Sequence, residues 1–311
     1  MSIGQYIKII GRGKQGARAI TREQAADLFG QVLDGAVTDL EIGAFCLAMR
    51  IKGETPEEMA GFLDATALRM QHFSAQPQQP IIVIPSYNGA RKLPLLTPLL
   101  ALLLAREGLG VLVHGTATES RAVYTSKVLE WLDIHAQEAT KEIASGEVIF
   151  ASTALLCPGL QRLLEVRRVV GLRNPAHSLV KLMNPVAGKS LIVSSYTHPE
   201  YAISMAQTFE LMKSDALLLR GTEGESVADA RRHPRMEGFV AGQRVLLQEA
   251  QSGTLAILPE LPSAIAAQST AHYISEVLAG RSPVPAPIAQ QVAHILQLIP
   301  QIMDASLEPV V

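Results

Sequence analysis

The chain has 311 residues and a mass of 33.4 kDa, which is enough for one large domain with a smaller one. Its 48% hydrophobic and 18% charged residues, with a mean hydropathy of +0.20, exclude a disordered chain and are typical of a packed globular protein. A net charge of -2 excludes a general attraction to nucleic acids or acidic membranes, so such a partner needs a local basic patch.

The beginning of the chain is basic, with five cations and no carboxylate in residues 1–22: Lys8, Arg12, Lys14, Arg18 and Arg22. Within it, GRGKQG has the spacing of a dinucleotide-binding loop, and YIKII before it resembles a strand. In a dinucleotide-binding fold an acidic residue at the end of the second strand binds the ribose. The candidate for that residue, Asp34, lies in a helix-ending Asp-Gly turn, which argues against this fold. A solvated loop, or a flexible basic loop that contacts a phosphate backbone, is therefore preferred.

Three short helices are predicted next, because each has a capping box at its start and glycines in the turns that follow. We expect a helical domain over residues 1–72, which later helices can complete, and a polar connection over residues 72–80. The three capping boxes are Thr21 with Gln24, Thr38 with Glu41, and Thr55 with Glu58.

A larger α/β domain is predicted over residues 73–311, because short β-branched runs alternate with helices, as in a mostly parallel central sheet. One of these helices has a capping box of Thr197 and Glu200, and two helices close the chain. A hairpin is predicted from residues 244–248 and 254–258. The other strands are expected at residues 81–84, 110–113, 148–151, 191–195 and 216–219.

The loop at residues 85–92 follows the first of these strands and precedes an apolar helix, where parallel sheets collect ligands. Asn88 and Gly89 allow a tight turn, Tyr87 can stack on a base, and Arg91 and Lys92 can pair with phosphate. Anion binding is the preferred interpretation. The alternative is an ordinary turn with solvated basic ends.

Other candidate groups are weaker. His114 suits acid-base chemistry, because the unperturbed pKa of histidine lies near neutrality, but it has no evident serine or cysteine partner and is expected to order its loop. Glu223 and Glu225 are expected to be solvated, and a metal site is the alternative. Walker loops, HExxH, GxSxG and zinc-finger spacings are absent from the sequence, and Cys46 and Cys157 are expected to be isolated core thiols. Without an apolar run of roughly 20 residues or a signal region, we expect a cytoplasmic protein with no membrane partner.

The sequence resembles the anthranilate phosphoribosyltransferase and class III nucleoside phosphorylase family along nearly its whole length. The resemblance begins in ITREQAADLFGQVLDG and continues through VHGTATESRAVYTSKVLEWL, GLRNPAHSLVKLMNPV and LLLRGTEGES. It implies the fold of that family, with a small helical domain and a larger α/β domain. Arg173 matches the arginine that these enzymes use toward the anthranilate carboxylate.

The substrate loops depart from the family pattern. The diphosphate loop of the family is similar to GTGGDG, and this chain has SYNGAR; the KHGNRS segment is replaced by VHGTAT. Ser226 and Val227 stand where the family has a magnesium-holding Asp-Glu pair. The resemblance therefore implies a protein without a cofactor that does not catalyse the family reaction.

The sequence is most similar to a divergent YbiB-like bacterial branch, which implies a homodimer, paired through the helical domain, that binds DNA or RNA with little sequence preference. A transferase with an altered loop and magnesium, and a binding protein for a small anionic metabolite, are the alternatives. The expected contacts with nucleic acid are Lys8, Arg12, Lys14, Arg18, Tyr87, Asn88, Gly89, Arg91, Lys92, His114, Arg121, Arg167, Arg168, Arg173 and Lys181.

Overall fold

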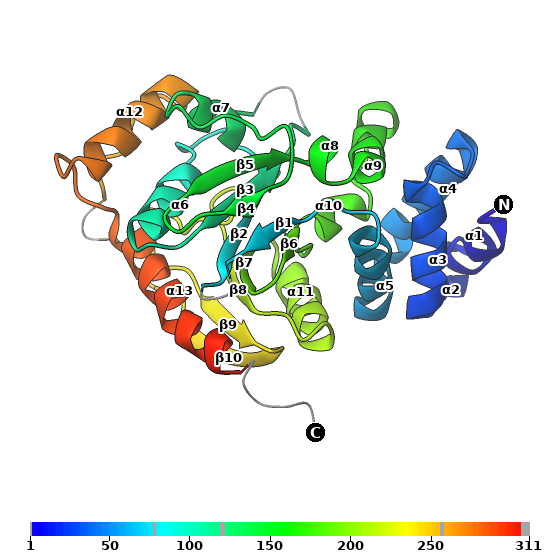
Figure 1. Ribbon diagram of the computed structural model, residues 1–311. Coiled ribbons are helices and arrows are strands. Elements are labelled where there is room, and N and C mark those ends of the chain that lie inside the picture. Colours follow the sequence, from blue (N-terminus) through cyan, green and yellow to red (C-terminus); the bar gives the residue numbers. More distant parts are fainter. Residues whose placement is uncertain (1, 77–78, 119–121, 256–257, 306–311) are drawn as a thin grey trace. The chain divides into compact units, whose positions relative to one another are not determined.

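The computed structural model describes residues 2–76, 79–118, 122–255 and 258–305 (Figure 1). The chain divides into two compact units. The helical unit contains Met1–Gln71 and Thr153–Pro185, and the α/β unit contains His72–Ser152 and Val186–Val311. The helical unit thus takes a second segment from the region expected to form the α/β domain.

The helical unit contains the three predicted helices α3 (Arg22–Leu33), α4 (Asp39–Lys52) and α5 (Pro56–Ala67). Each capping threonine accepts a hydrogen bond from the backbone of the third helical residue, whose side chain accepts one from the threonine backbone. All three capping boxes are therefore confirmed. This reciprocal pattern satisfies backbone donors that a helix start otherwise leaves without partners.

Residues 4–10 and 13–16 are helical, so the loop expected over residues 11–16 contains a short helix, and YIKII is not a strand. They form α1 (Gly4–Ile10) and the short α2 (Gly13–Gly16). Tyr6 and Ile10 are buried at helical spacing, and the Tyr6 hydroxyl donates to Asp27 over 2.6 Å. Lys8 therefore lies on a helix, whereas Arg12 is the N-cap of α2 and Arg18 follows it.

Aromatic rings form the centre of the helical unit. Phe29 stacks on Phe62 with ring centroids 4.6 Å apart, and Phe45 packs edge-on against both. The unit is completed by α8 (Thr153–Leu156), α9 (Pro158–Val170) and α10 (Ala176–Leu179). Cys46 and Cys157 are free and buried, and burial raises the pKa of the Cys46 thiol to about 12, so the prediction of core thiols is confirmed.

The α/β unit is built on a seven-stranded sheet in the order β10-β9-β8-β7-β2-β3-β5. Its β2, β3, β5, β7 and β8 are parallel, whereas β9 and β10 are antiparallel to their neighbours, which confirms the mostly parallel sheet. A small parallel sheet has the order β4-β1-β6. The bounds are β1 (Phe73–Ala75), β2 (Ile81–Ser86), β3 (Val111–Gly115), β4 (Glu142–Ile143), β5 (Val148–Ser152), β6 (Val186–Ala187), β7 (Ser190–Tyr196), β8 (Ala216–Arg220), β9 (Met236–Val240) and β10 (Gln243–Gln248).

Two local expectations in this unit are wrong. The hairpin partner of β10 is the preceding β9, paired across a turn at Ala241 and Gly242, and not residues 254–258, of which 256–257 lie outside the described residues. The helix after residue 197, α11 (Pro199–Leu211), has His198 as its N-cap and no side-chain cap. Pro199 at the first helical position therefore sets its start.

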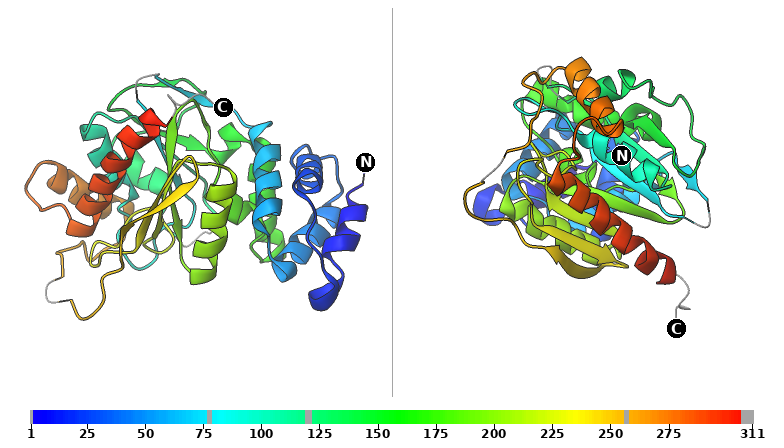
Figure 2. Two further views of the ribbon diagram at one scale, coloured as in Figure 1. Left: turned by 90° about the horizontal axis from the view of Figure 1, so that it is seen from below. Right: turned by 90° about the vertical axis from the view of Figure 1, so that its left-hand side faces the viewer.

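Helices cover the seven-stranded sheet on both faces (Figure 2). One face packs on α6 (Thr97–Arg106), α7 (Thr125–Glu130), α12 (Ala267–Leu278) and α13 (Ala286–Asp304), as the buried cluster of their apolar side chains shows. On the other face α11 packs through Phe209, whose ring lies 5.4 Å from that of Phe239 in β9. Among the described residues, no helix has the length and apolar character needed to cross a membrane.

Candidate anion-binding site

The loop after β2 is closed by a carboxylate of its own chain. Glu225 is 1% exposed and accepts hydrogen bonds from the backbone amides of Asn88 and Gly89, each over 2.7 Å. Its other carboxylate oxygen accepts from the hydroxyl of Ser86 and lies 3.4 Å from that of Thr97. Backbone amides at such a turn can bind an anion, and here the bound anion is the side-chain carboxylate of Glu225.

A second carboxylate does the same for the following residues. One oxygen of Glu223 accepts hydrogen bonds from the amides of Arg91, Lys92 and Leu93, each over 3.1 Å. The carbonyl of Glu223 also accepts from the Asn88 side chain over 3.1 Å. The expectation that Glu223 and Glu225 are solvated is therefore wrong, because both neutralise backbone donors of the loop at residues 85–92.

The segment that carries these carboxylates is fixed in place. Ser226 donates to the carbonyl of Pro85 over 3.0 Å, and the Gln291 side chain bonds to the backbone of Ser226 and Ala228. Gly224 has a φ of +87°, and a side chain there would overlap the Asn88 amide. The backbone at Gly224 therefore lies close to the Asn88 side chain, which only a glycine permits, and this holds Glu223 and Glu225 against the loop.

Tyr87, in this loop, and His114, in β3, are both buried. The Tyr87 hydroxyl is 2.9 Å from Nδ1 of His114, and the two residues are 3% and 0% exposed. Asn88 is 6% exposed. Direct contacts of Tyr87, Asn88 and His114 with a polyanion do not fit this arrangement, because their side chains do not reach the surface. This corrects the expectation that Tyr87 stacks on a base.

His114 is expected to make stability depend on pH. Burial lowers the pKa of its imidazole from 6.5 to about 3, and its Nε2 has no hydrogen-bond partner among the described residues. The unfolded chain then binds the proton more readily between these pKa values, so the free energy of unfolding falls as pH decreases below about 6.5.

We expect this dependence to be about 1.4 kcal/mol per pH unit in that range. The His114→Asn variant keeps a hydrogen-bonding atom near the position of Nδ1 for Tyr87 but does not titrate, so it should lack this component. Urea unfolding of both proteins between pH 7 and pH 5 tests it. Parallel pH curves would show that His114 does not stay neutral in the folded state.

The basic candidates are divided between the two units. In the α/β unit, Arg91 and Lys92 are exposed at the end of the loop. In the helical unit, Lys8, Arg12, Arg18 and Arg168 are exposed, and Arg167, Arg173 and Lys181 are partly buried. Arg121 and the side chain of Lys14 lie outside the described residues.

Sequence reasoning missed a second group of cations in the α/β unit. Arg220, at the end of β8, lines a cavity together with residues from the loop that follows it. The run ARRHPR at residues 230–235 was the available signal, because it follows a predicted strand. The cations that line this cavity are Lys92, Arg220, Arg231, Arg232 and Arg235.

The residues at the family's metal position do not fit magnesium. Ser226 is committed to the Pro85 carbonyl, Val227 has no donor atom, and the nearby carboxylate of Glu225 is occupied by loop donors. In the part of the chain that the structure describes, no group of three or more His, Cys, Asp or Glu side chains could hold a metal ion. We therefore assign no metal ligand here.

Comparison with known proteins gives relatives over nearly the full length. The chain is 39% identical over 303 residues to the protein YbiB of Escherichia coli (strain K12), covering 95% of this chain and 94% of YbiB. It is 28% identical over 264 residues to the anthranilate phosphoribosyltransferase of Methanosarcina acetivorans, covering 82% of this chain and 67% of that enzyme. A family model for the helical bundle domain of a glycosyl transferase family matches residues 5–70.

Solved structures support the same assignment at the level of the fold. The anthranilate phosphoribosyltransferase of Thermus thermophilus matches with a TM-score of 0.68 and 20% identity, covering 94% of this chain and 85% of that one. The Saccharomyces cerevisiae enzyme, in complex with PRPP and Mg, matches with a TM-score of 0.68 and 14% identity, covering 97% and 89%. The chain belongs to the anthranilate phosphoribosyltransferase-like glycosyltransferase family, in the branch of YbiB.

Proposed function

We propose that this protein is a cytoplasmic homodimer that binds nucleic acid with little sequence preference, on a phosphoribosyltransferase fold that no longer performs the family reaction. The observation that carries the proposal is the loop at residues 85–92. Its amides already bind Glu223 and Glu225, so a diphosphate would have to displace two carboxylates of the same chain. A small anionic substrate is therefore disfavoured at this loop.

Exposed cations support binding to a larger polyanion. Lys8, Arg12 and Arg18 lie on or beside α1 and α2, where no acidic residue of the sequence precedes Glu23. The Arg12 side chain donates to the Lys8 carbonyl, which keeps the two cations close together. Such a group of charges attracts phosphates through counterion release and does not read bases.

An exposed apolar stripe on α4 supports the dimer. Leu40, Leu47 and Ile51 are 84%, 47% and 60% exposed, and their spacing places them on one side of the helix. Apolar side chains grouped in this way are typical of interaction surfaces. The stripe belongs to the helical unit, through which the dimer is proposed to form.

The Leu47→Asp variant is therefore expected to be mainly monomeric. A charge in an apolar interface must be desolvated without a partner, which should weaken dimerisation at least about tenfold. Sedimentation equilibrium of wild type and variant measures the change, and Leu258→Asp, an exposed leucine of the other unit, is the control. A variant as dimeric as wild type would exclude this stripe from the interface.

The second candidate function is a phosphoribosyltransferase or nucleoside phosphorylase-like glycosyltransferase with an altered loop. It is favoured by the names of relatives such as the Methanosarcina acetivorans enzyme. Under this function magnesium would accompany the sugar phosphate, and Arg173 would contact the acceptor. Such an enzyme requires Glu223 and Glu225 to release the loop.

A paired titration tests both functions. The full-length protein is titrated with a fluorescent oligonucleotide, and separately with phosphoribosyl diphosphate plus magnesium, each at about 50 and 200 mM salt. We expect oligonucleotide binding that weakens steeply with salt and no saturable binding of phosphoribosyl diphosphate. The absence of oligonucleotide binding at low salt would refute the proposed function, and saturable, magnesium-dependent binding of phosphoribosyl diphosphate would favour the second.

A further inference from the structure

The cavity lined by Arg220 lies where neighbouring parallel strands of the α/β unit end. Tyr196 is the last residue of β7 and Arg220 the last of β8, and the two are paired in the sheet. Lys92 belongs to the loop after β2, the next strand along the sheet. Ligands of parallel sheets bind at such carboxyl ends. This cavity has about 1020 Å³, which is large enough for a nucleotide-sized molecule.

The charge of the cavity is not neutralised by its own carboxylates. Its lining includes five cations and two carboxylates, Glu223 and Asp229. Asp229 binds Arg231 with two hydrogen bonds of 2.9 and 2.7 Å, and Glu223 accepts from backbone amides. The side chains of Lys92 and Arg220 have neither a hydrogen bond nor an ion pair with any described residue. They leave positive charge available to a ligand.

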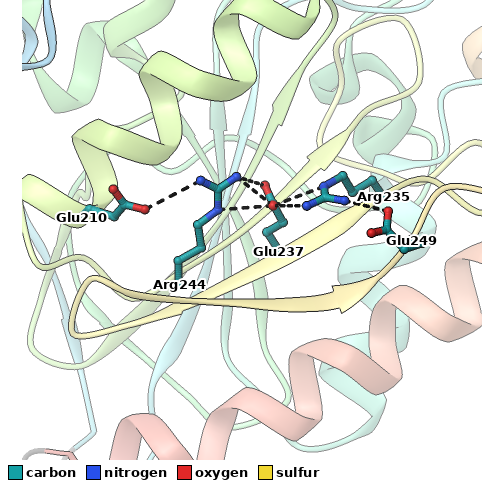
Figure 3. Close-up of polar contacts among 5 residues, drawn as sticks. All are labelled: Glu210, Arg235, Glu237, Arg244 and Glu249. Atoms are coloured by element: carbon teal, nitrogen blue, oxygen red, sulfur yellow. Dashed lines mark hydrogen bonds and ion pairs between the residues drawn. The ribbon is translucent and has the colours of Figure 1, made fainter.

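Other arginines form a rigid wall. Arg232 donates to the carbonyls of Gln251 and Gly253 over 3.0 and 2.9 Å, so it keeps its charge while it ties two loops together. Arg235 is held between Glu237 and Glu249, and the buried Glu237 also binds Arg244 over 2.8 Å (Figure 3). These contacts fix the wall before a ligand arrives, which lowers the entropy lost on binding.

The cavity is also lined by apolar and aromatic residues. The ring of Tyr196 is partly buried, and Leu93, Pro199 and Ala202 also line the space. A flat ring could stack there, with phosphates placed toward Arg220 and Lys92. We infer that this cavity binds a nucleoside phosphate, either as a free nucleotide or as the terminal unit of a strand. The inference goes beyond the proposed function, because it holds for a free nucleotide even if no oligonucleotide binds.

Isothermal titration of the full-length protein with ADP, adenosine and pyrophosphate tests the inference. We expect ADP to bind saturably and more tightly than either fragment. The Arg220→Gln variant should weaken ADP binding by about tenfold or more, because it removes a charge-assisted hydrogen bond. Arg281→Gln, which removes an exposed cation paired with Glu276 outside the cavity, should leave ADP affinity within about twofold.

A second variant separates ring from phosphate recognition. Tyr196→Leu should weaken ADP binding and leave pyrophosphate binding unchanged. Competition by an oligonucleotide with a 5′-phosphate, but not by its unphosphorylated form, would identify a strand end as the occupant, and no competition by either would identify a free nucleotide. The inference is overturned if ADP does not bind saturably, if adenosine or pyrophosphate binds as tightly as ADP, or if Arg220→Gln has no effect. Equal melting temperatures of wild type and Arg220→Gln confirm that the exposed substitution leaves folding intact.

Discussion

Replacing Glu225 with alanine is expected to destabilise the protein by about 3 kcal/mol, because buried donors then lose their acceptor. The amides of Asn88 and Gly89 donate to this carboxylate, as does the hydroxyl of Ser86, which also lies 2.7 Å from the Thr125 hydroxyl. Glu225→Gln retains one carbonyl acceptor for the two amides, and its amide group can donate to a hydroxyl. We expect it to cost about 1 kcal/mol, measured by urea unfolding.

The same variant gives a direct test of whether the carboxylate replaces a bound anion. Glu225→Ala removes a fragment with the shape of acetate, and the freed amides form a small anion site. Sodium acetate should therefore raise the melting temperature of Glu225→Ala more than that of wild type or Glu225→Gln, with sodium chloride as the control. If acetate affects all three proteins equally, the loop has collapsed or does not bind anions.

The helices of the first segment were predictable because their signals are local. Thr21, Thr38 and Thr55 satisfy backbone groups only three residues away, so tertiary packing does not alter the outcome. The sequence alone does not decide the structure of residues 4–10, because a short apolar run fits a strand or a helix equally well. The burial of Tyr6 and Ile10, which depends on the rest of the unit, decides for the helix.

The closed loop was not predictable from local pattern, because Glu225 meets Asn88 across 137 positions of sequence. Sequence position indicated a loop at the end of β2, and the family resemblance implied that its substrate residues differ from the family pattern. Neither showed that the two acidic residues of RGTEGES would accept hydrogen bonds from the amides of this loop. The structure alone shows that the loop which lacks the family's glycines is also the loop whose amides bind Glu223 and Glu225.

Apart from Lys92, the cations of the cavity escaped notice for a related reason. Arg220 and Arg232 come from β8 and the loop after it, Lys92 comes from the loop after β2, and each alone resembles an ordinary solvated charge. The sheet order β8-β7-β2 brings the ends of their strands together. Crossover connections between parallel strands bring together residues that are far apart in the sequence. The positions of the charges in the sequence do not show this proximity.

Removing the cations at the beginning of the chain should have the largest effect on the proposed nucleic-acid binding. We expect the combined Lys8→Gln, Arg12→Gln and Arg18→Gln variant to lose about a hundredfold or more in affinity near 0.1 M salt, with a salt slope reduced by up to about 2.7. Each lost phosphate contact releases about 0.9 fewer counterions, so the loss should be similar for all oligonucleotide sequences.

The matched control removes three cations elsewhere, through Lys127→Gln, Lys213→Gln and Arg281→Gln in the α/β unit. Both variants change the net charge equally. If binding rests on a general electrostatic attraction, both should lose the same affinity for the oligonucleotide, whereas with a local interface only the first variant should lose affinity. Fluorescence anisotropy at several salt concentrations separates these results. Equal losses of affinity in the two variants would place the nucleic-acid contacts outside α1 and α2. Arg167, Arg168 and the cavity cations would then be the remaining candidates. A loss confined to the first variant would place the nucleic-acid contacts on the segment around α1 and α2, where Lys8 lies in α1, Arg12 is the N-cap of α2 and Arg18 follows α2.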